Sequence, residues 1–579
     1  MQITVSSQAL RRQRLFFLVV FLLGMARGAG ADVPADVALL HGRIHTQDAN
    51  RTVVEAMALR GNTIVAVGTQ RAITALVGPH TQTIDLRGRT VLPGIIDAHT
   101  HPAESAPDLA KCSLGDKRLT PPQIKTRVGA CLKENPGPPA QWFEVVQVNP
   151  TGLNLTRADL DAILSSRPLV LSGADGHTAW ANSSALAAAH VTAATRDPAG
   201  GRIERDANGR PTGTLRDDAI EVVIGARPPP TLDYEIAQLQ KAFAAMRATG
   251  ITSVQDASVD EHLMQVYKRL YDAHNLNMRV RGCFHLVDLH RSARQLIDEA
   301  VKFRDRWAVD PEFLRADAIK IFADGVIEYP SQTAALLEPY LDADGHPTGN
   351  RGPSYFEQNN LNRMVSAADA AGLSVHVHAI GDRAVRATLD AFAYSRRENG
   401  PGDNRDQIAH LELVNPADFP RFKELGVIAN FQLLWAERDD YIDYGTLKYL
   451  GPGRSRYIYP ARSLRDAGAL IAGGSDWNVS SFDAFEAMEH AITRAEARGK
   501  PALLPQESIG LQDMIDAYTI NAAFALKQER TTGSLESGKR GDFIVLDRDP
   551  FSIDPYDLHE VRVLSTYLDG REVYATRGR

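Results

Sequence analysis

Residues 93–102 read Pro-Gly-Ile-Ile-Asp-Ala-His-Thr-His-Pro, a short apolar run that ends in two histidines separated by one residue. Side chains two residues apart on a strand project from the same face, so we expect His99 and His101 to lie side by side. Two neutral imidazoles on one face can chelate a divalent transition-metal ion. Two ordinary polar residues at a strand end would give the same pattern. The choice between a metal-binding pair and ordinary polar residues therefore depends on the rest of the chain.

Short apolar runs of this kind recur downstream and alternate with helical patterns. Eight runs are predicted to be buried parallel strands: residues 91–98, 251–256, 278–285, 318–323, 373–378, 407–411, 426–431 and 469–472. Eight strand-then-helix units predict an α/β protein with a closed (β/α)8 TIM barrel, in which catalytic groups gather at the carboxyl ends of the strands. The alternative is an open doubly wound sheet. No G-x-G-x-x-G follows any strand, which argues against a dinucleotide-binding version.

The segments around the predicted barrel differ from it in character. Residues 32–92 and 526–579 contain short strands separated by turn residues, so both ends are expected to pair into one small β domain. The catalytic barrel would then occupy residues 93–525. The first two barrel strands are separated by far more residues than one helix needs, which predicts an inserted subdomain at about 103–230 that serves as a lid.

The N-terminus has the order of a secretory signal. Arg11, Arg12 and Arg14 precede an apolar run at residues 15–25, and small residues follow at 29–31. The run is too short to cross a bilayer, which takes about 20 residues. We therefore expect residues 1–31 to be a signal peptide and the mature protein to be exported, periplasmic or secreted, without stable membrane insertion. An uncleaved membrane anchor is the alternative, and either the general or the twin-arginine export route would fit.

Composition excludes several classes of protein. The 579 residues carry a formal net charge of −7, which gives no support to a nucleic-acid partner. Three cysteines cannot form a disulfide scaffold. In an oxidising compartment Cys112 and Cys131 could pair, although two buried free thiols are equally compatible with the sequence. Cys283 lies in a strand-like run and is expected in the core.

Polar residues end several of the later strands. His378 lies nearer the carboxyl end of its strand than His376, so we expect His378 as a metal ligand and His376 in the core or behind a ligand. His410 interrupts another apolar strand; by itself it would be a core histidine. Asp476 follows a buried strand, and a buried carboxylate needs a cation or a proton donor.

Lys320 also interrupts an apolar strand. One interpretation is a lysine paired with a neighbouring acid, Asp317 or Asp324. The other is a lysine at the metal site. An ammonium group has no lone pair and cannot ligate a metal, whereas a carboxylated lysine offers two oxygens that could bridge two ions.

Taken together, these segments resemble the amidohydrolase superfamily. The resemblance is carried by PGIIDAHTHP, AIKIFADG, HVHAIGDRAV, QIAHLELV and AGGSDWNV, and by GSLESGKRGDF at residues 533–543. DGHTAW at residues 175–180 and TAAL at residues 333–336 are similar to the branch that includes N-substituted formamide deformylases. The resemblance covers nearly all of residues 37–575. It implies a barrel with a β-sandwich-like domain built from both termini.

The resemblance also implies roles for individual residues. The metal ligands would be His99, His101, Lys320, His378, His410 and Asp476. They would hold one or two divalent ions, and zinc is the metal we expect. Lys320 would be modified to N6-carboxylysine and would bridge the two ions. Asp476 would also move the proton. His177 and Arg383 are candidates for orienting the substrate or the oxyanion, with structural hydrogen bonding as the alternative.

The chain departs from the branch in two segments that follow barrel strands, VIEYP at residues 326–330 and LLW at residues 433–435. Glu328, Tyr329 and Trp435 are therefore expected to contact the substrate. The predicted reaction is hydrolysis of a non-peptide amide-type C–N bond in a small molecule by metal-activated water. Ester, lactone or carbamate hydrolysis, deamination, and an exported binding protein that has lost turnover are the alternatives. A homo-oligomer is also compatible with the sequence.

Overall fold

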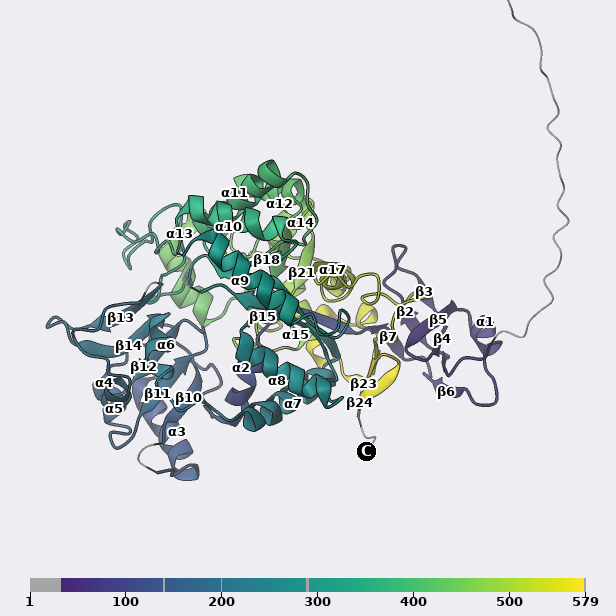
Figure 1. Ribbon diagram of the computed structural model, residues 1–579, viewed down its shortest axis with the longest axis horizontal. Helices are drawn as coiled ribbons and strands as arrows, with labels where there is room; N and C mark the ends of the chain where they lie inside the picture. Colours follow the sequence, from purple (N-terminus) through teal and green to yellow (C-terminus); the bar gives the residue numbers. More distant parts are fainter. Residues whose placement is uncertain (1–32, 139–140, 199, 288–290, 577–579) are drawn as a thin grey trace, which may run out of the picture.

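The computed structural model describes residues 33–138, 141–198, 200–287 and 291–576. The predicted signal peptide, residues 1–31, lies outside the described residues. Within those ranges no helix is long and apolar enough to cross a membrane. A central barrel, an insertion on one side and a β domain on the other make up the molecule (Figure 1).

Eight parallel strands in chain order form the barrel, which confirms the predicted fold. They are β8 (Ile95–Thr100), β15 (Ile251–Val259), β16 (Arg279–His285), β17 (Leu314–Phe322), β18 (Ser374–Ala379), β19 (Gln407–His410), β20 (Ile428–Phe431) and β21 (Ile471–Gly473). Two hydrogen bonds join the end of β8 to the segment after β21. The Asp476 amide donates to the His99 carbonyl at 2.7 Å, and the His101 amide donates to the Trp477 carbonyl at 2.9 Å. The first and last strands therefore meet at the catalytic end.

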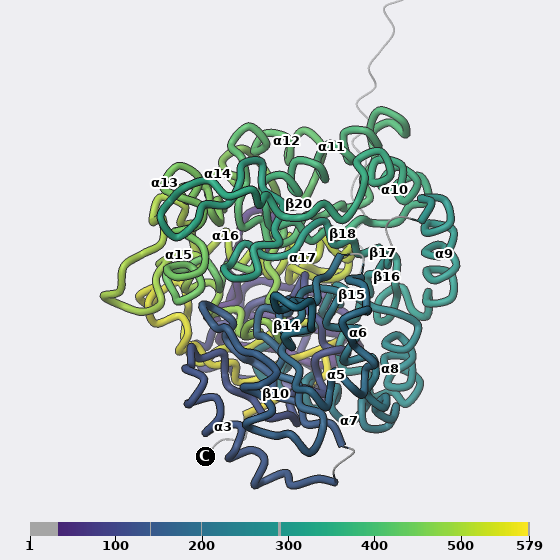
Figure 2. The backbone as a smooth tube through the Cα atoms, turned by 90° about the vertical axis from the view of Figure 1, so that its left-hand side faces the viewer, coloured from purple at the N-terminus to yellow at the C-terminus, as the bar shows by residue number. Residues whose placement is uncertain are grey.

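Helices cover the outside of the strands, and three of them begin at residues whose side chains cap them. The longer ones are α7 (Leu232–Ala248), α8 (Glu261–Asp272), α9 (Ala293–Arg306), α10 (Gln358–Ala370) and α11 (Asp382–Asn399). The side chains of Thr231, Asp260 and Ser292 accept hydrogen bonds from the first turns of α7, α8 and α9. The apolar faces of these helices bury residues such as Phe243, Tyr267 and Phe392. Figure 2 shows α8 to α11 curving around one side of the strands.

The first predicted strand, residues 91–98, is divided in the structure. Thr90–Pro93 forms β7 in the β domain, and Ile95–Thr100 forms β8 in the barrel. The break falls at Gly94, where a Cβ atom would collide with the side chain of Thr252. Glycine therefore lets the chain pass from one sheet to the other against the start of β15. Pro93-Gly94 is the only sequence signal of this change, and the prediction of one strand over residues 91–98 passed over it.

The β domain joins the two ends of the chain. One sheet has the order β24 (Arg571–Ala575), β23 (Val563–Leu568), β22 (Phe543–Leu546), β7, β2 (Arg43–His45) and β3 (Val53–Val54). The other has the order β5 (Thr63–Gly68), β4 (Ala56–Arg60), β1 (Val37–Leu40) and β6 (Gln82–Asp85). Antiparallel pairing of β7 with β22 links the N-terminal and C-terminal segments. Leu39, Met57 and Phe543 belong to one buried cluster shared by both sheets, as in a sandwich.

The insertion between β8 and β15 forms a subdomain with its own sheet and its own apolar clusters (Figure 1). The sheet has the order β13 (Gly201–Arg205), β14 (Pro211–Asp217), β12 (Thr178–Ala181), β11 (Leu169–Gly173), β10 (Phe143–Val148) and β9 (Cys112–Ser113). Of the two cysteine alternatives, the structure contains the disulfide. Cys112 of β9 is bonded to Cys131 of α3 (Pro121–Glu134), with Cα atoms 5.9 Å apart. Cys283 is free and buried.

Candidate metal centre and cavity

The ends of β8 and β21 bring three predicted ligands into contact. His99 Nε2 lies 3.3 Å from Asp476 Oδ1, and His101 Nε2 lies 3.1 Å from the same oxygen. Asp476 adopts a φ of 53°, a left-handed conformation that costs a non-glycine residue on the order of 1 kcal/mol or more. Asp97, buried two residues before His99 on the same strand, accepts a hydrogen bond from the Ser475 amide at 2.9 Å. The chain on both sides of Asp476 is therefore fixed against β8.

His410 completes this group from the end of β19. Both of its ring nitrogens are buried, and neither has a hydrogen-bond partner among the described residues. An unpaired buried polar atom costs about 1–3 kcal/mol. The imidazole also stacks on Trp435, with ring centroids 5.6 Å apart and an interplanar angle of 7°. A side chain held this firmly with both nitrogens unpaired indicates a ligand supplied from outside the chain.

The donor atoms of His99, His410 and Asp476 all lie within 4.8 Å of one another. Two imidazole nitrogens and one carboxylate oxygen are the donors that zinc commonly takes in catalytic sites. Burial lowers the pKa of His410 well below its usual range, despite the nearby Asp476. The imidazole is therefore neutral at physiological pH, which is the form that ligates a metal.

Lys320 lies beside the group, with Nζ 3.4 Å from His99 Nε2. Burial lowers the pKa of Lys320 to about 8. The neighbouring acids considered as its partners are used elsewhere. Asp317 pairs with Arg281 at 2.5 Å. Asp324 accepts backbone hydrogen bonds, from Gly381 at 2.8 Å among others. Lys320 therefore forms no ion pair with Asp317 or Asp324 among the described residues.

His376 and His378 lie on the same strand, β18, but contact different neighbours. His376 Nε2 lies 2.8 Å from His99 Nδ1, and its other ring nitrogen lies 3.1 Å from the Gln255 side chain. His376 thus fixes the orientation of His99 from behind. The His378 ring lies 4.4 Å from the His410 ring between centroids, and its Nε2 lies 3.1 Å from the Gly325 carbonyl oxygen. All six predicted ligands are gathered at this end of the barrel.

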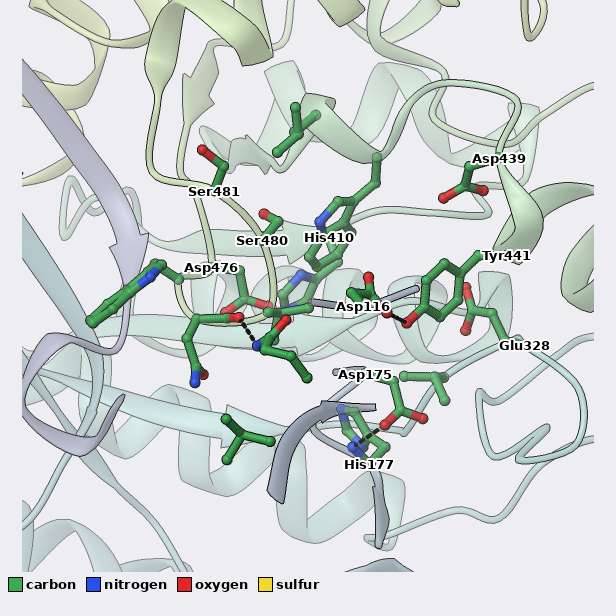
Figure 3. Close-up of a pocket in the computed structure, with 18 of the residues that line it drawn as sticks. Asp116, Asp175, His177, Glu328, His410, Asp439, Tyr441, Asp476, Ser480 and Ser481 are labelled. Carbon is green, nitrogen blue, oxygen red and sulfur yellow. Dashed lines mark hydrogen bonds between the residues drawn. The ribbon is translucent and has the colours of Figure 1, made fainter. Parts of the chain in front are cut away.

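A cavity of about 600 Å³ opens over the group, lined by both the barrel and the insertion (Figure 3). Asp476, His378 and His410 line it from the barrel, and Asp116 and His177 line it from the insertion. This volume is in the range of sites for small organic molecules. The insertion therefore covers the candidate metal centre and supplies part of the cavity wall.

His177 is one of the residues predicted to contact the substrate, and it lines the cavity. Its Nδ1 lies 2.7 Å from Asp217 Oδ1, and its ring lies 5.4 Å from that of His378. Burial would lower the pKa of His177, but the hydrogen bond and the negative charge of Asp217, with the charges of Asp175 and Asp476, together outweigh it and raise the pKa to about 9. His177 is therefore a cationic group in the cavity wall at neutral pH. Glu328 and Trp435 also line the cavity.

Two predicted substrate contacts lie elsewhere. Arg383 donates hydrogen bonds to the backbone carbonyls of residues 351–353, at 2.7 Å for Gly352, and does not line the cavity. A guanidinium just after a strand end resembles a cavity residue in sequence, but here it fixes a loop. Tyr329 is 41% exposed and stacks on Tyr449, with ring centroids 4.7 Å apart. Neither side chain lines this cavity, and Arg383 makes the structural hydrogen bonds that were its alternative role.

Other residues of the site were missed by sequence reasoning. The Tyr441 hydroxyl donates to Asp116 at 2.6 Å, joining the loop after β20 to the insertion across 325 positions. No local pattern could show this contact. Asp324 did carry a signal, since it follows a buried strand as Asp476 does. It accepts hydrogen bonds from three backbone amides, those of Ala335, Ile380 and Gly381, and so fixes the loop after β18.

The geometry agrees with a comparison of the sequence with protein-family models. The model described as "Amidohydrolase family" matches residues 82–574. The chain belongs to this family. This amidohydrolase is thus a metal-dependent hydrolase that acts on carbon–nitrogen bonds, as the sequence predicts.

Several relatives match nearly the whole chain. This amidohydrolase is 29% identical over 569 residues to the N-substituted formamide deformylase of Arthrobacter pascens, covering 94% of this chain and 99% of the relative. It is 30% identical over 560 residues to the protein LONG AFTER FAR-RED 3 of Arabidopsis thaliana, covering 94% and 92%. Among solved structures, an uncharacterized metal-dependent hydrolase from Pyrococcus furiosus superposes with a TM-score of 0.67 at 23% identity, over 89% of this chain and 100% of that one. That likeness supports the fold.

Proposed function

We propose that this amidohydrolase cleaves a non-peptide amide-type C–N bond of a small molecule, using one or two zinc ions. Six residues would hold the metal: His99, His101, Lys320, His378, His410 and Asp476. The observation that carries the proposal is His410, whose two buried nitrogens lack partners while its donor atom lies within 4.8 Å of those of His99 and Asp476. The relative named as a formamide deformylase supports an amide over an ester as substrate.

Asp476 is the residue that we assign to proton transfer. A bound divalent ion supplies a Lewis acid that lowers the pKa of water from 15.7 to about 7. Burial would raise the pKa of Asp476, but the imidazoles of His99 and His101 hold it well below its usual range. Both imidazoles contact Oδ1, so Oδ2 is the oxygen that accepts the proton of the attacking water and returns it to the leaving amine.

His177 is suited to stabilise negative charge on the substrate oxygen. Its hydrogen bond to Asp217 keeps the ring protonated, and the ring faces the cavity beside His378. A fixed cation in a water-poor site stabilises a developing oxyanion more than water does. The carbonyl group of the amide that is hydrolysed would therefore lie between the metal ligands and His177.

We also propose that Lys320 is carboxylated. Its lowered pKa leaves part of the amine neutral, and the neutral Nζ can add to carbon dioxide, forming an N–C bond and releasing a proton. Intact-protein mass spectrometry under native conditions, with isotopically labelled bicarbonate, would show a labelled adduct that is absent in Lys320→Ala. An unmodified lysine in the zinc-loaded active enzyme would contradict this.

The experiment for the proposed activity begins with metal analysis of the purified protein. We expect hydrolysis in a panel of N-formyl compounds, N-acyl amino acids, cyclic imides and lactones, with loss on chelation and recovery with zinc. His99→Ala and Asp476→Asn should each abolish turnover while circular dichroism and the thermal midpoint show an intact fold. Near-normal turnover in either pure variant would contradict the assignment. A protein that holds little zinc and turns over nothing would be the inactive binding protein instead.

We propose in addition that the protein is exported after removal of residues 1–31. The order of basic, apolar and small residues at the N-terminus supports this, and so does the Cys112–Cys131 disulfide, because such bonds persist in oxidising compartments. The mature N-terminus, sequenced from the extracytoplasmic fraction, should begin near residue 32. A full-length protein confined to the cytoplasm would overturn the proposal.

A further inference from the structure

One half of the cavity is built from carboxyl side chains. We call it the acidic wall; its members are Asp116, Asp175, Glu328, Glu412, Glu437 and Asp439. They come from the insertion and from segments after three different barrel strands. In Figure 3, the labelled members Asp116, Glu328 and Asp439 lie on the other side of His410 from Asp476 and Ser480. None of the six acids is among the proposed metal ligands, although Glu412 follows His410 by two residues and all six line the same cavity.

The chain supplies little positive charge against the acidic wall. Lys111 lines the cavity, but its ammonium group pairs with Asp108 at 2.7 Å and with Glu144 at 2.6 Å. No arginine lines the cavity within the described ranges. His177 is paired with Asp217. Carboxylates gathered without counter-ions repel one another, so this half of the cavity attracts a cation from solution.

A second observation points to a ligand. Glu412 is only 1% exposed, and its side chain lines the cavity. Its carboxyl group shares one hydrogen bond with Glu328, but its Oε1 has no hydrogen-bond partner among the described residues. Glu437 Oε2 is also buried without a hydrogen bond among the described residues, although His490 Nδ1 lies 3.5 Å away. Leaving an acceptor unpaired in this way costs about 1–3 kcal/mol. A donor from outside the chain, bound in the cavity, would satisfy both oxygens.

Aromatic rings accompany these acids. Trp435, Tyr441 and Tyr459 line the same cavity as the acidic wall. The faces of aromatic rings attract organic cations within about 6 Å. Burial and the neighbouring Asp439 raise the pKa of Glu437 to about 8, which is how a carboxyl group responds when it lacks a counter-ion.

We propose that the acidic wall binds an ammonium or guanidinium group of the substrate, so that the enzyme selects amides whose remote end is cationic. This inference rests on the proposed hydrolysis at the metal centre and names the substrate class for it. The acidic wall does not form a metal cage, because the only group of three close metal-binding side chains in the described part of the chain is His99, His410 and Asp476. Dispersed acceptors with aromatic faces suit an organic cation, and they repel an anionic substituent.

Matched substrates test the proposal. Mono-N-formyl straight-chain diamines carry a free ammonium group, N-formyl alkylamines of equal length are neutral, and N-formyl ω-amino acids are anionic. We expect kcat/KM to be about 10- to 100-fold higher for the best cationic substrate than for its neutral counterpart, the size expected of hydrogen bonds between charged groups. The anionic series should be slowest, and added salt should reduce the preference. Equal rates for cationic and neutral substrates would overturn the proposal.

Variants locate the effect. Glu328→Gln and Asp439→Asn should each reduce kcat/KM for the cationic substrate about tenfold or more while the neutral substrate changes about twofold or less. Asp298→Asn is the matched control, because this carboxylate is 62% exposed on α9, away from the cavity lining. Equal losses for cationic and neutral substrates in the acidic-wall variants would contradict a cation site.

Direct binding separates this inference from the proposed activity. Calorimetry with Asp476→Asn protein should show that straight-chain diamines bind, that alkylamides do not compete, and that Glu328→Gln weakens diamine binding. If no amide is hydrolysed but diamines bind, the proposed function fails and the cation site stands. If diamines do not bind, the cation site fails whatever the activity. Calcium binding abolished by Glu328→Gln, without diamine binding, would assign the acidic wall to an inorganic cation and overturn the proposal.

Discussion

At the scale of single residues, two of the proposed metal ligands have backbone conformations that cost free energy. His410 and Asp476 have φ values of 76° and 53°, both in the left-handed region that side chains usually avoid. Each lies directly at or after the end of a barrel strand, where the chain must turn while its side chain points into the cavity. Strain of this kind persists where surrounding hydrogen bonds fix the backbone. Here the Asp476 amide bonded to the His99 carbonyl serves that purpose.

The His177–Asp217 pair predicts how activity depends on pH. The hydrogen bond with Asp217 raises the pKa of His177 to about 9, above the ordinary value of 6.5. The stabilisation of the protonated ring is therefore complete below pH 6.5 and disappears as the pH rises through about 9. We expect kcat/KM to fall near pH 9. In Asp217→Asn, which removes the charged acceptor, this alkaline limb should move toward lower pH.

Measured pH profiles of both proteins test this expectation, with kcat and KM separated. Asp298→Asn serves again as the control and should leave the limb in place. An unchanged limb in Asp217→Asn would show that His177 is not the group that titrates.

Sequence reasoning could find those site residues that obey a strand-end rule. His99, His410 and Asp476 each interrupt or follow an apolar run, because a barrel places its chemistry where strands end. Asp116 and Tyr441 gave no such signal, since their contact depends on how the insertion folds over the barrel. For Arg383 the sequence left two roles open, because the carbonyl groups that accept its hydrogen bonds belong to a distant loop.

At the scale of elements, the sequence predicted where the barrel strands lie. It did not predict that the first run is split into β7, in a sheet of the β domain, and β8, in the barrel. Apolar runs identified all eight barrel strands, but the passage from β7 to β8 at Gly94 depends on the close approach of Thr252. The insertion shows the same limit. Its presence followed from the distance between the first two strands, whereas its sheet order and its role in lining the cavity required the fold.

The disulfide of the insertion yields a prediction about this element. Cys112–Cys131 closes a loop of 19 residues, which stabilises the folded state by about 3 kcal/mol in the chain-entropy model. Ser113 and Asp116 of the cavity wall follow directly after Cys112. Cys112→Ser/Cys131→Ser should therefore raise KM several-fold and increase hydrogen exchange over β9 and α3. The metal content should stay unchanged, because the ligands belong to the barrel.

Reduction of the native protein should have the same effect as the double substitution. The double variant itself should be insensitive to reductant, although Cys283 is still present. If KM and exchange in the double variant equal those of the native protein, the bond does not order the cavity wall.

At the scale of the whole molecule, the β domain is attached to the barrel away from the metal centre. Arg279, the first residue of β16, pairs through Nε with Asp542 Oδ2 at 2.7 Å, and both side chains are 3% exposed. The Thr566 hydroxyl donates to the Arg247 carbonyl at 2.7 Å. These contacts lie where barrel strands begin, whereas the ligands lie where they end. Stability and chemistry are thus assigned to opposite ends of the barrel.

This separation makes Asp542 a test of stability without chemistry. Burial would lower the pKa of Arg279, but Asp542 outweighs it and raises the pKa above its usual range, so the guanidinium stays charged. Asp542→Ala leaves that charge buried with Asp569 as its remaining carboxylate, which should cost about 3 kcal/mol of the free energy of unfolding. The zinc-loaded kcat/KM should remain within about twofold, because the ligands are untouched. Urea unfolding followed by fluorescence and circular dichroism measures the change.

Arg279→Met/Asp542→Leu should recover most of the loss, since no buried charge is left unpaired. A loss below about 0.5 kcal/mol in Asp542→Ala, the size of an ordinary surface change, would mean that this pair does not hold the β domain to the barrel.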